Sequence, residues 1–292
     1  MTGSIEHALA WVEKGDLQQA IRTLDRPTGT RMDRAQAFHL RALFCLDLSM
    51  CAQAKESLEA ALALSHDNVG ILTDYAQLLN QLEDAQAESV YARIYELDRR
   101  HALACLSLAD FAYGRSDVER ALQLCSTALA LPGALQVVAY SKRSLLYAQQ
   151  GQADLAKNDA LQAIALDAGN ASGHLHLGLA EYGLGNYHAC IVACDRALGL
   201  QPRSIQALMN KGLACLRLKE FYQAIDCFKA ILRLDGEFIR VYGQLSVAYY
   251  HALDMAAVQK CLDRRAELVN DFQGRWLAMM TAIAIAPESQ IE

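Results

Sequence analysis

The chain has 292 residues, of which 53% are hydrophobic and 21% are charged, and only 4 are proline. This composition is too apolar for a disordered chain, and the small aromatic share of 7% leaves Ala and Leu dominant, which favours helices. The formal net charge of −6 argues against a nucleic-acid partner and against an anionic membrane surface, because like charges repel.

The N-terminal residues MTGSIEHALAW lack the charged start, apolar stretch and cleavage site of a secretion signal. The longest nearly apolar run, 276–286, is about half of the ~20 residues that span a membrane, so no membrane insertion is expected. The 9 cysteines contain no CxxC pair, which fits a reducing compartment better than a disulfide framework. We therefore expect a cytoplasmic protein.

Residues 1–34 predict a first, divergent helical hairpin, in which Trp11 and Ala20 take apolar positions. Around the end of this hairpin there are five arginines but only two aspartates, Asp25 and Asp33. One interpretation is that the arginines form a small basic patch. These arginines are Arg22, Arg26, Arg31, Arg34 and Arg41. A solvated helix face is the simpler interpretation, and the one we favour.

Three later stretches repeat one pattern every 34 residues without a gap. Each predicts two amphipathic helices, with a short polar turn between them and a small residue in the first helix, at Ser144, Gly178 and Gly212. The predicted buried stripes of the second helices are Ala156, Ala160 and Ala163, then Cys190, Cys194 and Ala197, then Ala224, Phe228 and Ile231. In the last copy the turn is Lys219-Glu220, and we expect a left-handed cap at Gly236.

With indels of one residue, the register extends over most of the chain. The predicted hairpins are 1–34, 35–68, 69–101, 102–136, 137–170, 171–204, 205–238 and 239–272. Pro27, Pro132 and Pro202 then fall at the ends of second helices, and Pro287 follows the final helix. Because proline is costly inside a helix, its placement is an independent check on the register.

The last hairpin departs from the pattern, since Val258, Leu262 and Arg265 replace its small, aromatic and small residues. Residues 273–292 predict one more helix and a tail, which we expect to cap the array. A contact with a partner protein or a second copy of the chain, through Trp276 and Met280, is the alternative.

The 34-residue pattern resembles the tetratricopeptide repeat family, whose signature combines a small residue in the first helix with an Ala, an aromatic and a helix-ending proline around the second. Ala121, Cys125, Ala128 and Leu131-Pro132 extend it into 102–136. The resemblance implies an all-α fold, a right-handed α-solenoid of about eight hairpins over 1–272 with a C-terminal capping helix in 273–292.

In this family the first helices of the hairpins line a concave groove that holds an extended peptide of a partner. Carried onto this chain, the groove starts with the polar residues Thr73, Asp74, Gln77 and Asn80. The resemblance then places in it Leu106, Tyr113, Leu145, Leu175, Leu179, Tyr182, Met209, Asn210, Leu213, Arg217, Arg240 and Gln244. Many peptide-binding members have, at the position of Asn210, an Asn whose amide holds the ligand backbone as both donor and acceptor.

Members that bind the C-terminal tails of heat-shock chaperones grip a carboxylate with Lys, Asn and Arg side chains. Here Leu175 and Leu179 precede Asn210, and Arg240 and Gln244 follow it, so that clamp is incomplete. We expect instead a ligand that combines apolar anchors with an acidic group near Arg217 and Arg240.

No sequence motif for catalysis or nucleotide binding is present: GxxxxGK[ST], GxGxxG, HExxH and GxSxG are all missing. His188, Cys190 and Cys194 have spacing that suits metal ligands, but the repeat assigns both cysteines to packing positions, and His174 and His176 face opposite ways. We assign no catalytic, cofactor or metal-binding residue.

The function that we expect is that of a non-enzymatic adaptor or scaffold, which binds an extended segment of another protein. Alternatives are a peptide-sensing regulator that acts with a separate effector subunit, and a non-catalytic subunit of an enzyme or of a secretion or assembly complex. An enzyme is the weakest alternative, because no acid, base and nucleophile converge.

Overall fold

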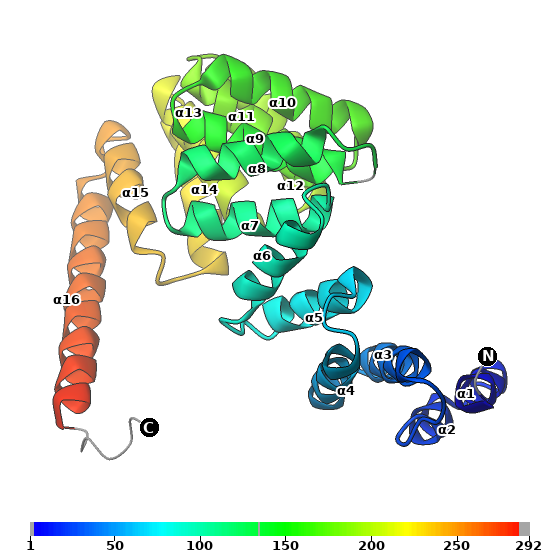
Figure 1. Ribbon diagram of the computed structural model, residues 1–292. Coiled ribbons are helices and arrows are strands. Elements are labelled where there is room, and N and C mark those ends of the chain that lie inside the picture. The colour runs from blue at the N-terminus through cyan, green and yellow to red at the C-terminus, as the bar shows by residue number, and fades with distance from the viewer. Residues whose placement is uncertain (1–2, 134, 286–292) are drawn as a thin grey trace. The chain divides into compact units, whose positions relative to one another are not determined.

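The computed structural model describes the backbone of residues 3–133 and 135–285, and side chains as far as residue 270. The described residues form 16 helices, which pair sequentially into hairpins (Figure 1). In chain order they are α1 (Gly3–Glu13), α2 (Leu17–Thr23), α3 (Arg31–Asp47), α4 (Cys51–Leu64), α5 (Val69–Gln81), α6 (Ala87–Leu97), α7 (Ala102–Gly114), α8 (Val118–Leu129), α9 (Gln136–Gln149), α10 (Ala153–Leu166), α11 (Ala171–Gly183), α12 (Tyr187–Leu200), α13 (Ile205–Arg217), α14 (Phe221–Leu234), α15 (Ile239–His251) and α16 (Met255–Ile285). This confirms the all-α fold.

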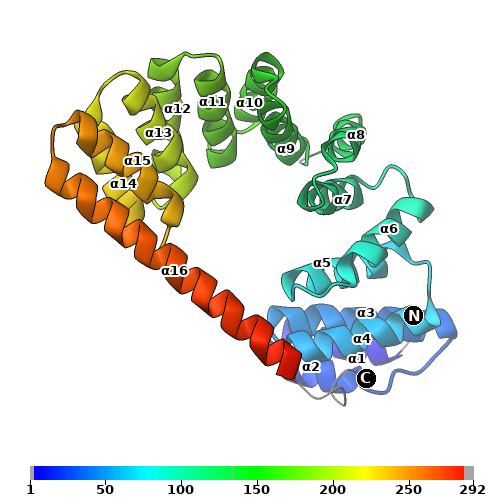
Figure 2. The same cartoon turned by 90° about the vertical axis from the view of Figure 1, so that its left-hand side faces the viewer.

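The chain divides into two compact units, residues 1–139 and 140–292. In the first, the helices from α1 to α7 bury a continuous apolar cluster that includes Leu58, Leu79 and Ile94. In the second, the hairpins from α10 to α16 follow one another as neighbouring helices, and α13 and α14 pack on α15 (Figure 2). Phe228 and Ile231, both 0% exposed, belong to the apolar cluster at that end.

The predicted packing stripes are confirmed. Ala156, Ala160 and Ala163 are each 0% exposed, as are Cys190 and Cys194, and Ala197 is 1% exposed. In α11 and α13 the small residue of the first helix is a glycine because the second helix leaves no room for a side chain. A Cβ atom on Gly212 would lie 2.6 Å from Cε1 of Phe228, and one on Gly178 would lie 2.8 Å from Sγ of Cys194.

The turn inside each hairpin contains one residue in the left-handed region, with φ between 54° and 78°. These residues are Gly15, Ser49, Glu83, Ser116, Gly151, Gly185, Lys219 and Leu253. Their spacing follows the repeat, because each ends the first helix with the reversal that the second helix requires. The left-handed cap expected at Gly236 is wrong, because the C-cap residue of α14, Asp235, has an extended conformation (φ −145°, ψ 98°) and Gly236 is not among the described glycines with positive φ.

The second helix of the last hairpin also differs from the prediction. Instead of a separate helix after residue 272, α16 continues without interruption from Met255 to Ile285. The segment contains no proline, and one glycine in a helix interior costs about 1 kcal/mol, too little to end the helix. The side chains of Trp276 and Met280 lie outside the described residues.

The arginines near the first connection take part in structural contacts. Arg41 Nε donates to Oδ1 of Asp25 at 2.8 Å, and Arg31 Nε donates to the carbonyl of Leu64 at 2.7 Å. Arg31 is exposed, as a solvated helix face requires, whereas the side chain of Arg41 is only 14% exposed and is neutralised by Asp25.

Candidate peptide-binding groove

Two adjoining cavities lie between α13 and α15 in the second unit. The first, which we call the cationic cavity, has a volume of about 580 Å³. It is lined by Arg203, Ile205, Gln206, Met209, Asn210, Leu213, Asp235, Phe238, Arg240 and Gln244. The second, the aromatic cavity, has a volume of about 770 Å³. It is lined by Tyr182, Leu213, Leu216, Arg217, Lys219, Phe221, Gln244, Val247 and His251.

Leu213 and Gln244 line both cavities and join them into one groove. The cationic cavity gathers residues from the N-terminal halves of α13 and α15, and the aromatic cavity gathers residues from their C-terminal halves. The groove therefore follows two consecutive first helices, which is where the family resemblance predicts it.

Asn210 lies in the cationic cavity, partly buried on α13. Its backbone carbonyl accepts a weak hydrogen bond from Sγ of Cys190 at 3.8 Å, which ties α13 to α12. The side-chain amide forms no hydrogen bond to any described residue. It is therefore available, as a donor and an acceptor, to the backbone of a bound segment.

The walls of the aromatic cavity are fixed by their own contacts. The ring of Tyr182 meets that of Tyr187 edge-on at 5.5 Å between centroids, and Phe221 stacks on His251 at 4.8 Å. Arg217 Nε donates to the hydroxyl of Tyr182 at 3.2 Å, and this bond raises the pKa of the guanidinium. A guanidinium has five N–H donors, so the others stay available to a ligand.

The structure brings together seven of the predicted groove residues. They are Tyr182, Met209, Asn210, Leu213, Arg217, Arg240 and Gln244. Leu145, Leu175 and Leu179 are partly buried on α9 and α11 and do not line either cavity.

Two predicted groove residues belong to the first unit. Tyr113 is 37% exposed at the end of α7. Leu106 is 2% exposed, so its assignment to the groove is wrong, because its side chain packs inside the first unit and offers a ligand no surface.

Among the lining residues that the sequence did not predict are Arg203, Phe221, Phe238 and His251. They lie at helix ends and in turns, where the repeat pattern fixes packing but leaves surface side chains free to vary. Aromatic residues on both sides of the turns were the signal available in the sequence.

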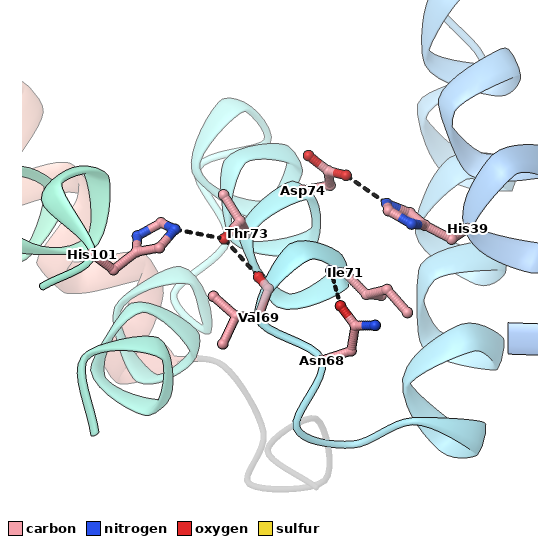
Figure 3. Close-up of polar contacts among 7 residues, drawn as sticks. All are labelled: His39, Asn68, Val69, Ile71, Thr73, Asp74 and His101. Atoms are coloured by element: carbon pink, nitrogen blue, oxygen red, sulfur yellow. Dashed lines mark hydrogen bonds and ion pairs between the residues drawn. The ribbon is translucent and has the colours of Figure 1, made fainter. Parts of the chain in front are cut away.

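The predicted polar start of the groove lies on α5, where Thr73 and Asp74 contact residues of both neighbouring hairpins (Figure 3). Oδ2 of Asp74 lies 2.6 Å from Nε2 of His39 on α3. Oγ1 of Thr73 donates to the carbonyl of Val69 at 2.7 Å and lies 3.2 Å from Nε2 of His101. These contacts join α3, α5 and α7, so Thr73 and Asp74 serve the structure of the first unit.

The contacts of His101 define its tautomer. His101 is the N-cap of α7, and its Nδ1 accepts from the backbone N–H of Ala104 at 3.2 Å. Nδ1 therefore carries no proton, and Nε2–H donates to Thr73, whose own proton is used toward Val69. At the matching positions of α5 and α11 the same cap is supplied by Asn68 and Asn170.

We expect His101→Ala to lower the free energy of unfolding by about 1 kcal/mol, because one backbone donor of α7 loses its cap. His101→Asn should restore most of this, since asparagine caps the matching helices. Urea unfolding of both variants, with amide exchange at Ala104, makes the comparison. Equal losses in the two variants would show that the cap is not what stabilises this position.

Cys190 and Cys194, for which a packing role was preferred over metal binding, are confirmed as packing residues. Cys190 and Cys194 are both 0% exposed, with their Sγ atoms 4.0 Å apart. The hydrogen bond with Cys190, together with burial, raises the pKa of Cys194 and keeps it protonated. Within the part of the chain with described side chains, no three His, Cys, Asp or Glu residues gather as a metal-binding group.

Of the helices that the structure describes, none combines the length and the hydrophobicity needed to cross a membrane.

Comparison with known proteins supports the repeat assignment. The family model "Tetratricopeptide repeat" matches residues 137–170 and 205–238, two of the hairpins predicted from the sequence. The human Protein O-mannosyl-transferase TMTC3 is 23% identical over 253 residues, which cover 84% of this chain and 27% of that protein. The chain thus spans about a quarter of the length of that relative.

Solved structures share the fold. A tetratricopeptide repeat protein from Parabacteroides merdae has a TM-score of 0.59 and 16% identity, and the match covers 84% of this chain and 97% of that one. The APC/C hetero-tetramer Cut9–Hcn1 also gives 0.59, with 15% identity over 89% of this chain and 79% of that one. The two hairpins at 137–170 and 205–238 are therefore tetratricopeptide repeats, and the other described helices continue the same paired arrangement, a fold that these solved structures share.

Proposed function

We propose that the protein is a non-enzymatic adaptor whose second unit binds an extended segment of a partner protein in the groove between α13 and α15. The observation that carries this proposal is the groove itself. Seven residues that the family resemblance assigns to peptide binding line two joined cavities. The amide of Asn210 and the guanidinium groups of Arg203 and Arg240 are hydrogen-bond donors there that no described residue pairs. Tetratricopeptide repeats are scaffolds for protein–protein interaction, which agrees with this role.

Each part of the groove has a separate task in binding. The side-chain amide of Asn210 donates to and accepts from the backbone of the bound segment. Met209, Leu213 and Val247 supply apolar surface, and Arg217 and Arg240 supply charged donors. A segment that lies along the groove crosses Leu213 and Gln244 and places side chains in both cavities.

The test uses the full chain as bait in native lysate, with wild type beside Asn210→Ala/Arg240→Glu. We expect the partner to be retained by wild type and its affinity for the variant to fall by roughly 30-fold, since a charge-assisted hydrogen bond contributes about 2 kcal/mol. Arg196→Glu is the matched control, because Arg196 is exposed on α12 and lines neither cavity. Equal retention of all partners by wild type and the double variant would contradict groove binding.

A further inference from the structure

We infer that the segment bound in the groove is acidic, with Asp or Glu carboxylates next to a bulky apolar or aromatic side chain. This inference rests on the proposed function, and it specifies the chemistry of the ligand. It follows from three features of the groove: the sign of its charge, the lack of partners for its cations, and the ordered apolar walls beside them.

The groove has a charge opposite to that of the chain. Its lining includes four cationic side chains and one carboxylate, whereas the whole chain carries a formal net charge of −6. The cations are Arg203, Arg217, Lys219 and Arg240, and the carboxylate is Asp235. A positive groove on an otherwise acidic protein attracts an acidic segment, and the surrounding surface disfavours nucleic acid.

The cations of the groove are not neutralised by the protein. Arg203 and Arg240 are exposed and form no ion pair with any described residue. Oδ1 of Asp235 already accepts from the backbone N–H of Glu237 at 2.9 Å. By contrast Lys211, which is also on α13, is paired with Asp195 at 2.6 Å and lines neither cavity.

Carboxylates suit the donors of both cavities. Arg240 and Arg203 offer guanidinium groups that bind a carboxylate through two parallel hydrogen bonds. The cationic cavity also lies near the N-terminal ends of α13 and α15, where the helix dipoles have the same positive sign. In the aromatic cavity, Nε of Arg217 donates a hydrogen bond to the hydroxyl of Tyr182. This leaves the two terminal nitrogens of the guanidinium for a second carboxylate.

The aromatic cavity provides the apolar anchor. Phe221, Val247 and Leu216 form apolar walls, and the stacking of Phe221 on His251 orders one wall before a ligand arrives. Pre-ordered walls reduce the entropy that is lost on binding. Because Arg217 and Lys219 border this cavity, the apolar side chain and the acidic residue of the segment lie close together in its sequence.

The experiment selects peptides from a random displayed library against the full chain. We expect enriched peptides to carry Asp or Glu beside Trp, Phe, Tyr or Leu, and their affinity to fall with rising salt. Arg203→Gln/Arg240→Gln should weaken the same peptides by at least about tenfold, and Arg196→Gln should leave them unchanged. Both variants replace exposed arginines, so folding is not at risk.

Synthetic versions of an enriched peptide separate the sources of the carboxylate. Replacing its Asp and Glu by Asn and Gln should abolish binding, whereas amidation of its C-terminus should change little. If amidation abolishes binding and the side-chain replacements do not, the inference of acidic side chains is overturned in favour of a terminal carboxylate.

The two proposals fail in different ways. Peptides that lose binding in Leu213→Glu but carry no excess of acidic residues would overturn the ligand chemistry and leave groove binding intact. If no peptide is enriched, or if enriched peptides bind equally well to Leu213→Glu and to wild type, groove binding and this inference are both overturned. Because Leu213 is partly buried, circular dichroism of Leu213→Glu must match that of wild type before its binding is interpreted.

Discussion

Replacing Ala224 by glutamate is expected to lower the free energy of unfolding of the second unit by about 4 kcal/mol or more. Ala224 is 0% exposed on α14, within the apolar cluster that also contains Phe228 and Val241. A glutamate there must bury its carboxylate without a partner or force α14 away from its neighbours. Either outcome loses the packing that joins consecutive hairpins.

The loss should be local as well as large, because a repeat array is stabilised mainly by contacts between neighbouring hairpins. Amide exchange should therefore increase most in α13, α14 and α15, and urea unfolding should give the free-energy change. Ala189→Glu is the matched control, since Ala189 is exposed on α12 and should change stability by less than about 0.5 kcal/mol. Equal stability of the two variants would show that the repeat register is wrong.

The stability of the second unit should also decrease as the pH falls through the titration of His176. Burial lowers the pKa of this histidine from 6.5 to about 4, although a hydrogen bond with the Ser141 backbone opposes the shift. Its Nδ1 is buried without a hydrogen-bond partner among the described residues, so a proton placed there has no acceptor. The nearby charge of Lys142 lowers the pKa further.

The sign follows from proton binding in the two states. Between pH 6.5 and about 4 the unfolded chain protonates His176 and the folded chain does not, so acid favours unfolding. Stability is fully retained above pH 6.5, and about 3 kcal/mol is lost by pH 4. The histidine thus destabilises the fold only in acid.

A comparison of wild type with His176→Leu across this pH range isolates the effect, because other titrating groups are common to both proteins. The stability difference between them should change by about 3 kcal/mol, whereas His188→Leu, at an exposed position on α12, should show no such change. Parallel stability curves for wild type and His176→Leu would contradict the assignment.

The helices and their packing faces were predictable because they follow from periodicity. The buried stripe of α14 at Ala224, Phe228 and Ile231 repeats in α10 and α12, and Pro132 and Pro202 follow the ends of α8 and α12. Steric exclusion also explains why position 212 is a glycine, because the ring of Phe228 leaves no room there for a side chain. These features depend on local spacing, which one sequence contains in full.

Other features depend on contacts that spacing does not specify. Leu106 occupies a position at which the repeat pattern predicts exposure, yet it is buried, because first helices differ in how they pack on their neighbours. The stacking of Phe221 on His251 joins the start of α14 to the end of α15, which no periodic pattern relates. His101 was recoverable from spacing, since it stands where Asn68 and Asn170 cap other first helices.

Photo-crosslinking from inside the groove tests the central claim most directly. A photoreactive residue placed at Gln244, which lines both cavities, is compared in native lysate with one at Val192, which is 63% exposed on α12. The proposal predicts a partner crosslinked from position 244, absent from position 192, and competed away by an acidic, aromatic peptide. Crosslinks to the same partner from position 192 alone would place the binding surface on the second helices and contradict the groove.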